Sequence, residues 1–112
     1  MRVVPTTTVD LSVLARVGTA LSDDSRRRIL VRLLDGPAFP ADLAAELGLT
    51  RPGVSNHLAC LQGCGIVVKG REGRNVRYAI SDPRLAHALG ELCQVMLGPA
   101  VGCEHEGGFG CE

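Results

Sequence analysis

The hydrophobic positions in the first third of the chain recur at helical spacing. Apolar residues three or four apart predict a helix from a cap at Asp10 to about Leu21. A second helix follows from a cap at Ser22 or Asp23, and Gly36-Pro37 ends it. Helical spacing in the first helix is held by Leu11, Leu14, Val17 and Leu21. The positions of the second helix expected to face inward are Ile29, Leu30, Leu33 and Leu34.

The stretch PADLAAELGLTRPGVSNHLACLQG has the start and stop residues of two helices joined by a tight turn. A short helix from Pro40 to Leu47 ends at Gly48, which accepts the left-handed backbone. Thr50 caps the next helix, and Pro52 lies in its first turn, where a missing N–H costs nothing. The inward face of this second helix holds Val54, Leu58 and Leu61, and its outward face holds Arg51, Ser55 and Asn56. This pattern predicts a helix–turn–helix.

Two β-prone runs, at 66–69 and 75–80, flank the basic sequence GREGR and predict a hairpin. A helix–turn–helix followed by such a hairpin is a winged helix, so the expected fold is mostly α with a β-hairpin wing. The wing is expected to contact the DNA backbone or minor groove through Lys69, Arg71, Arg74 and Arg77. The plainer interpretation is a charged hairpin that only faces solvent.

The last predicted helix is capped by Asp82 and ended by Gly98-Pro99. Its apolar residues recur at spacings of 4, 3 and 4, a stripe formed by Leu85, Leu89, Leu92 and Met96. This stripe favours pairing with its copy in a second chain, since two DNA half-sites require two-fold symmetry. Packing on its own domain is the alternative.

These elements divide the 112-residue chain into three parts. A polar segment covers 1–9, a winged-helix domain that binds DNA and dimerises covers 10–97, and a flexible glycine-rich tail covers 98–112. The tail has no basic residue and too little apolar surface to order alone. It carries Cys103, His105 and Cys111, so we expect it to order when it captures a ligand.

The charge of the chain is zero overall but unevenly distributed. Residues 50–80 contain five basic residues and one acidic residue, a local charge of +4, which predicts a basic face for DNA. No apolar run reaches the roughly 20 residues of a membrane span, and the N-terminus lacks an apolar leader. We therefore expect a cytoplasmic protein with no membrane partner. The sequence contains no phosphate loop, no pair of catalytic carboxylates and no nucleophile–base pair, so we do not expect an enzyme.

Cys60 and Cys64 are four residues apart on the second helix of the motif. Residues at this spacing share a helix face about 6 Å apart, so two thiolates can bind one soft ion together. His57, one turn earlier, could add a nitrogen ligand or contact DNA. Two alternatives stay open, because free cysteines often fill cores and neighbouring thiols can act as a redox switch.

The order of these elements resembles the ArsR–SmtB family of winged-helix metal-sensing repressors. The resemblance covers roughly residues 10–97 and rests on LSDDSRRRILVRLL, VSNHLACLQGCGIV, the GREGRNVRYAI wing and the final helix. It implies a homodimer that binds double-stranded operator DNA and controls metal-resistance genes.

Within that family the Cys60–Cys64 pair looks most like the CmtR branch, which senses cadmium and lead. There, two thiolates of the recognition helix and one from the C-terminal tail bind the metal. The resemblance implies Cys60, Cys64 and Cys103 as ligands, with Cys111 competing for the third position, and Cd(II) or Pb(II) as inducer without an organic cofactor. A response to As(III) or to thiol oxidation through the same cysteines is the alternative.

Overall fold

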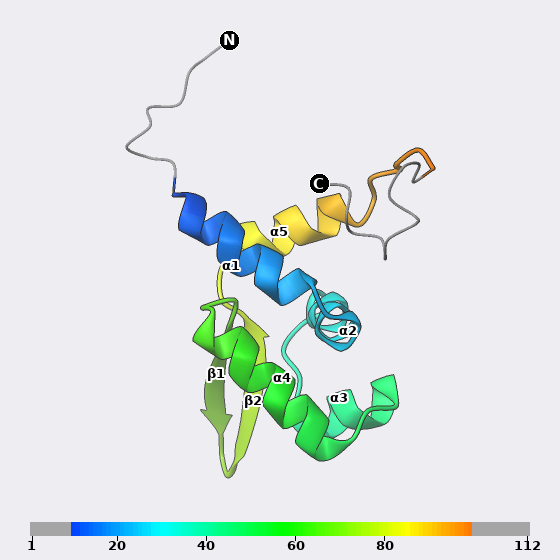
Figure 1. The fold of residues 1–112 in the computed structure, drawn as a ribbon. Coiled ribbons are helices and arrows are strands. Elements are labelled where there is room, and N and C mark those ends of the chain that lie inside the picture. The colour runs from blue at the N-terminus through cyan, green and yellow to red at the C-terminus, as the bar shows by residue number, and fades with distance from the viewer. Residues whose placement is uncertain (1–9, 100–112) are drawn as a thin grey trace.

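The computed structural model describes residues 10–99 as five helices and one antiparallel hairpin (Figure 1). In chain order these are α1 (Leu11–Leu21), α2 (Asp24–Leu33), α3 (Pro40–Leu47), α4 (Arg51–Gly63), β1 (Val67–Glu72), β2 (Asn75–Ile80) and α5 (Pro83–Leu92). The order and type of the elements confirm the predicted winged helix–turn–helix. No helix within residues 10–99 is long and apolar enough to cross a membrane.

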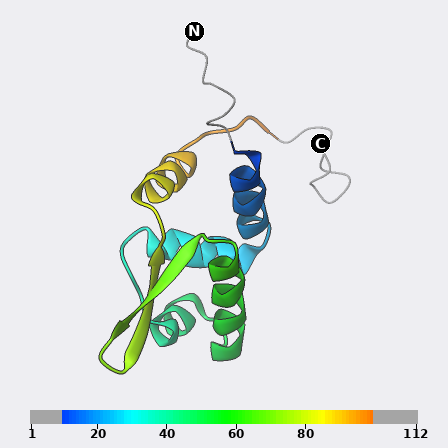
Figure 2. The same cartoon turned by 90° about the vertical axis from the view of Figure 1, so that its left-hand side faces the viewer.

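The elements lie at two ends of an elongated domain. Helices α1 and α5 lie at one end, and the tip of the β1–β2 wing and the α3–α4 turn lie at the other (Figures 1 and 2). Helix α4 connects the two ends, because it begins beside α3 and finishes near α1 (Figure 1). The segments expected to read DNA therefore lie away from those expected to dimerise.

Side-chain caps start four of the helices at the predicted residues. Asp10, Asp23, Thr50 and Asp82 each accept a hydrogen bond from a backbone N–H in the first turn of the helix that follows. Gly48 ends α3 with a φ of 68°, in the left-handed region that glycine enters without strain. The helix–turn–helix thus has the boundaries that its turn residues specify.

The core lies between α2, α3, α4 and the start of β1. The fully buried side chains include Ile29, Leu43 and the three inward residues of α4, namely Val54, Leu58 and Leu61. Burying side chains of this size from one helix face contributes about 1.5–3 kcal/mol each. This packing fixes which face of α4 remains free for a ligand.

The hairpin pairs Val67 with Ile80 at its base and Glu72 with Asn75 at its tip. The two residues between the strands are Gly73, with a φ of 65°, and Arg74. Ala38 and Tyr78 exchange backbone hydrogen bonds of 3.0 and 2.9 Å, which attach β2 to the loop before α3. The first strand is longer than predicted, since it starts at Val67 and extends into the sequence expected to form the loop.

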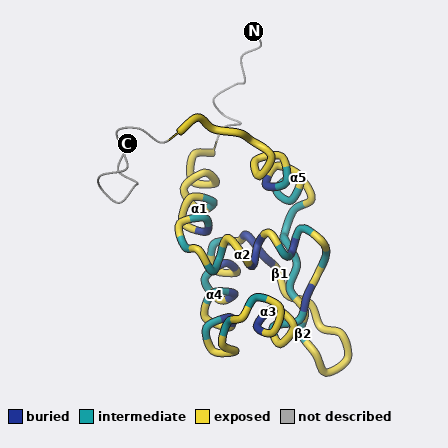
Figure 3. Tube along the Cα trace, turned by 90° about the vertical axis from the view of Figure 1, so that its right-hand side faces the viewer, coloured by how far each residue is buried: buried dark blue, intermediate teal, exposed yellow. Residues whose placement is uncertain are grey.

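The prediction that the last helix continues to Gly98 is wrong. Helix α5 ends at Leu92, and residues 93–99 form a turn followed by irregular, exposed chain (Figure 3). Leu89 is buried and Leu85 packs against the core, so the helix is supported up to that turn. Beyond it nothing in residues 10–99 covers the next apolar side chains, and a helix gains most of its stability from such packing.

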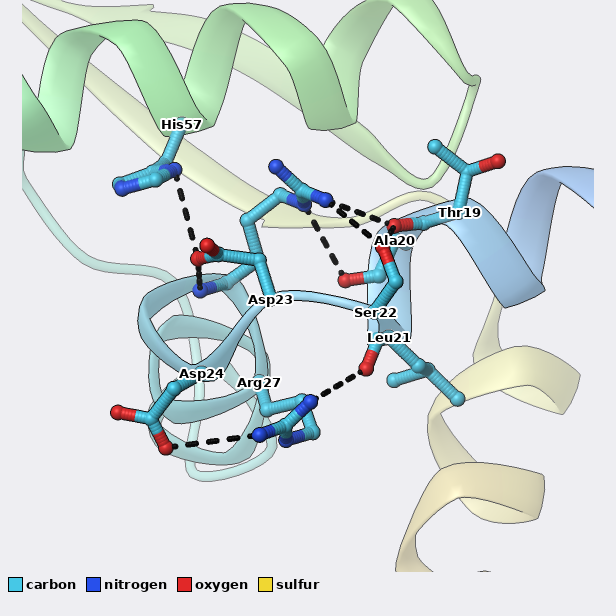
Figure 4. Close-up of polar contacts among 9 residues, drawn as sticks. Thr19, Ala20, Leu21, Ser22, Asp23, Asp24, Arg27 and His57 are labelled. Atoms are coloured by element: carbon cyan, nitrogen blue, oxygen red, sulfur yellow. Dashed lines mark hydrogen bonds and ion pairs between the residues drawn. The ribbon is translucent and has the colours of Figure 1, made fainter. Parts of the chain in front are cut away.

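The corner between α1 and α2 is closed by arginine side chains (Figure 4). Arg26 donates from its Nη2 to the carbonyl of Thr19 at 2.9 Å and from its Nε to that of Ala20 at 3.4 Å. Arg27 donates to the carbonyl of Leu21 at 2.8 Å. These carbonyls belong to the last turn of α1, and that of Thr19 also accepts from the N–H and the hydroxyl of the C-cap residue Ser22. Arg26 and Arg27 therefore cap the end of α1.

Candidate functional site

The two faces of α4 differ as the sequence predicts. Arg51, Ser55 and Asn56 are exposed, whereas Val54 and Leu58 are completely buried. A helix that follows a tight turn and exposes polar residues of this kind is suited to the major groove, where amide, hydroxyl and guanidinium groups read base edges.

His57 lies on a different side of α4 and faces the beginning of α2. Its Nδ1 is 3.8 Å from Oδ2 of Asp23, the N-cap of α2, and its side chain is half-buried (Figure 4). The contact links the recognition helix to the scaffold. The expected functions of His57, as a DNA contact or a metal ligand, stay predictions.

Asp23 makes the stability of this junction pH-dependent. The hydrogen bond from the Arg26 backbone N–H, with His57 adding in the same direction, lowers the pKa of Asp23 below its ordinary value of 3.8. A carboxyl whose pKa is lowered by folding stabilises the protein above its unfolded pKa and loses that contribution as the pH falls through its folded pKa.

We therefore expect Asp23→Asn to lower the melting temperature near neutral pH and to match the wild type more closely below about pH 3.8. Asparagine still caps the helix, so the difference measures the charge. Thermal unfolding between pH 2 and 7, by circular dichroism, checks this, with Asp35→Asn as a surface control. A constant difference at every pH would contradict it.

The basic residues of the wing are exposed but divide between its two faces. Directly paired residues share a face, so Lys69 and Arg71 lie with Tyr78 and Val76. Arg77 lies on the opposite face, where its Nε is 3.1 Å from Oε1 of Glu72. Arg74 occupies the turn. Arg77 thus has an acidic partner in the wing, whereas Lys69, Arg71 and Arg74 form no ion pair within residues 10–99.

Cys60 and Cys64 lie at the end of α4 that faces α1. Both are free thiols of intermediate exposure, and Cys64 is the C-cap residue, whose N–H donates to the carbonyl of Cys60 at 3.0 Å. Cys64 packs against the core cluster while remaining partly exposed, so the core-filler alternative stays open for it. Nη1 of Arg16 donates to the Cys64 carbonyl at 3.4 Å, a contact from α1 that sequence spacing could not reveal.

The thiol pair lacks further ligands within residues 10–99, where no three His, Cys, Asp or Glu side chains converge on one point. Two thiolates on one helix face fit two corners of a site for a soft ion, which needs at least one more ligand. The predicted third ligand, Cys103 or Cys111, lies outside the described residues, as does His105.

The ends of α1 and α5 expose several large apolar side chains (Figure 3). Leu11 is 70% exposed, Leu92 is 56% exposed and Met96 is 93% exposed. Two of the four predicted dimer-interface residues, Leu85 and Leu89, pack within their own domain, which was the alternative to dimer contact. Cys93 is exposed at the C-cap of α5, which rules out a core position in the single chain.

An exposed polar recognition helix beside an exposed basic wing defines a winged helix–turn–helix DNA-binding protein. The chain belongs to the arsR family of bacterial regulatory proteins, whose sequence profile matches residues 23–69. It is therefore a transcriptional regulator.

Similar proteins include a close mycobacterial relative and its solved structure. The HTH-type transcriptional regulator CmtR of Mycobacterium tuberculosis is 65% identical over 86 residues, which cover 77% of this chain and 73% of CmtR. The NMR structure of the cadmium metal-sensor CmtR from the same organism matches with a TM-score of 0.64 and 61% identity, over 79% of this chain and 92% of that one.

A second solved structure matches the fold at lower identity. It is the homodimeric winged helix-turn-helix DNA-binding domain of Mb0332 from Mycobacterium bovis, with a TM-score of 0.70 and 30% identity. The match covers 75% of this chain and 78% of that one.

Proposed function

We propose that this protein is a metal-responsive repressor that binds operator DNA without metal and releases it when Cd(II) or Pb(II) binds Cys60, Cys64 and a tail cysteine. The observation that carries the proposal is the position of the two thiols, at one end of the helix that exposes Arg51, Ser55 and Asn56. The likeness to a cadmium sensor with 61% identity supports cadmium as the inducer.

The repressor acts in the cytoplasm as a homodimer joined through α1 and the region around α5. Exposed Leu11, Leu14, Leu92 and Met96 supply the apolar surface, and the homodimeric neighbour from Mycobacterium bovis supports the arrangement. Two-fold symmetry then presents two recognition helices to successive major grooves. No organic cofactor takes part in this mechanism.

The release of DNA by metal follows from thermodynamic linkage between the metal site and the DNA-binding surface. An ion that binds the DNA-free conformation more tightly than the DNA-bound one weakens operator binding by the same factor, typically 5–150-fold. Thiolates are the binding form, so metal affinity rises with pH as the cysteines lose their protons.

The decisive experiment is fluorescence anisotropy of a labelled DNA fragment from upstream of the protein's own gene. Reduced, metal-free protein is titrated first, and Cd(II), Pb(II), Zn(II) or As(III) is then added separately. Release by Cd(II) or Pb(II) supports the proposal. Release by As(III) alone, or by peroxide with metals chelated, would replace it with the arsenic or redox alternative.

The wing makes a separate prediction about salt. Each lost phosphate contact reduces the slope of log affinity against log salt by about 0.9. A homodimer carries each substitution twice, so we expect Arg71→Ala to reduce the slope by about 1.8 and Arg77→Ala to reduce it by less, because Glu72 already pairs with Arg77. Anisotropy titrations over a salt series measure both slopes, and equal slopes for the wild type and Arg71→Ala would exclude a phosphate contact by Arg71.

A further inference from the structure

A cavity with a volume of about 440 Å³ lies beside the thiol pair, between α1, the end of α4 and the start of α5. Cys64 forms part of its wall, and the apolar side chains of Val17, Ile66 and Leu85 form another part. Ser81 closes one side, because its Oγ donates to the carbonyl of Gly65 at 2.8 Å. The cavity lies beside α1 and the start of α5, away from the wing tip (Figure 1).

Two guanidinium groups line this cavity. Arg16 extends from α1 over the Cys64–Gly65 backbone, and no carboxylate within residues 10–99 lies within ion-pair distance of it. Arg84 has a side chain that is 95% exposed and lies 3.8 Å from Asp82, whose carboxylate also caps α5. With two positive charges and one negative charge, the cavity favours an anion next to an apolar surface.

The tail of the chain contains a segment of matching chemistry. Residues 101–104 read VGCE, which places an apolar side chain two residues before Cys103 and a carboxylate directly after it. A second segment of the same form, FGCE, occupies 109–112.

We propose that residues 101–104 dock in this cavity when metal binds, with Glu104 pairing with Arg16 and Arg84 and Val101 covering the apolar wall. The inference rests on the proposed function and specifies how the third thiolate is recruited. Adjacent Cα atoms are about 3.8 Å apart, so a Cys103 that shares an ion with Cys64 brings Glu104 near Arg16, which contacts the Cys64 carbonyl, and into the cavity that Arg84 also lines. The charge pair stabilises the closed site without touching the metal.

The test compares two matched variants, Glu104→Gln and Glu112→Gln, each next to a tail cysteine. Cd(II) is buffered by a competing chelator, and binding is followed by the ultraviolet sulfur-to-cadmium absorption band and by release of operator DNA. We expect Glu104→Gln to need about two- to fivefold more free Cd(II), and Glu112→Gln to match the wild type. High salt should erase the difference, since it screens exposed charge pairs.

A charge exchange separates pairing from a local structural effect. Arg84→Glu, at an exposed side chain, should weaken Cd(II) binding, and Arg84→Glu combined with Glu104→Arg should recover part of the loss. If Glu104→Gln needs no more Cd(II) than the wild type, or if the double variant recovers no Cd(II) affinity, the docking is overturned. The repressor function still stands in that case, provided that the wild type releases DNA in response to Cd(II). A shift for Glu112→Gln alone would assign the cavity to 109–112 instead. A wild type that ignores Cd(II) would reject both proposals.

Discussion

Replacing Cys64 by serine is expected to abolish the release of operator DNA by Cd(II) while leaving metal-free operator binding close to that of the wild type. Serine has nearly the same shape, but its hydroxyl is a poor ligand for a soft ion. Cys64 is bonded to α4 and α1 through its backbone, and these contacts do not need the sulfur. The variant should therefore lose the whole coupling, about 5–150-fold in operator affinity.

Anisotropy with and without Cd(II) measures this loss, and Cys60→Ser should behave in the same way. Cys93→Ser is the matched control, because Cys93 is an exposed thiol on α5, away from the pair. Comparing Cys103→Ser with Cys111→Ser then decides which tail cysteine completes the site. A Cys64→Ser protein with a normal Cd(II) response would place the metal elsewhere.

Leu58→Ala is expected to produce the largest loss of stability, about 2–5 kcal/mol in the free energy of unfolding. Leu58 is completely buried on the inward face of α4, so truncation leaves a cavity among residues of α2, α3 and β1. Denaturant unfolding at one fixed protein concentration measures the change, because the stability of a dimer depends on concentration. Val68→Ala, at a side chain that is 50% exposed, should change it by less than about 0.5 kcal/mol.

Turn chemistry explains why the helix–turn–helix could be predicted to the residue. Pro40, Gly48 and Thr50 act through the backbone conformation or hydrogen bond of their own segment, so each marks a boundary independently of the rest of the fold. The alternation of buried and exposed positions on α4 follows in the same way from helical spacing, and the solvent accessibilities confirm it.

The features that the sequence did not predict depend on partners distant in the chain. The end of α5 was misplaced because Gly98-Pro99 only limits a helix, whereas packing decides where it stops. The capping contacts of Arg26 could not be predicted, because its carbonyl partners, six and seven residues earlier, meet it only at the α1–α2 corner. The contact of Arg16 with Cys64 spans 48 residues and requires the folded core.

The position of the thiols on α4 gives the helix the mechanics of a lever. Arg51 and Cys64 are 13 residues apart, which is about 20 Å along a helix. A tilt of about 10° around the cysteine end would move the Arg51 end by about 3.5 Å. Hydrogen bonds to bases tolerate only a few tenths of an ångström around 2.9 Å, so such a tilt would break all of them at once. A small rearrangement at the metal could thus switch the protein fully off its operator.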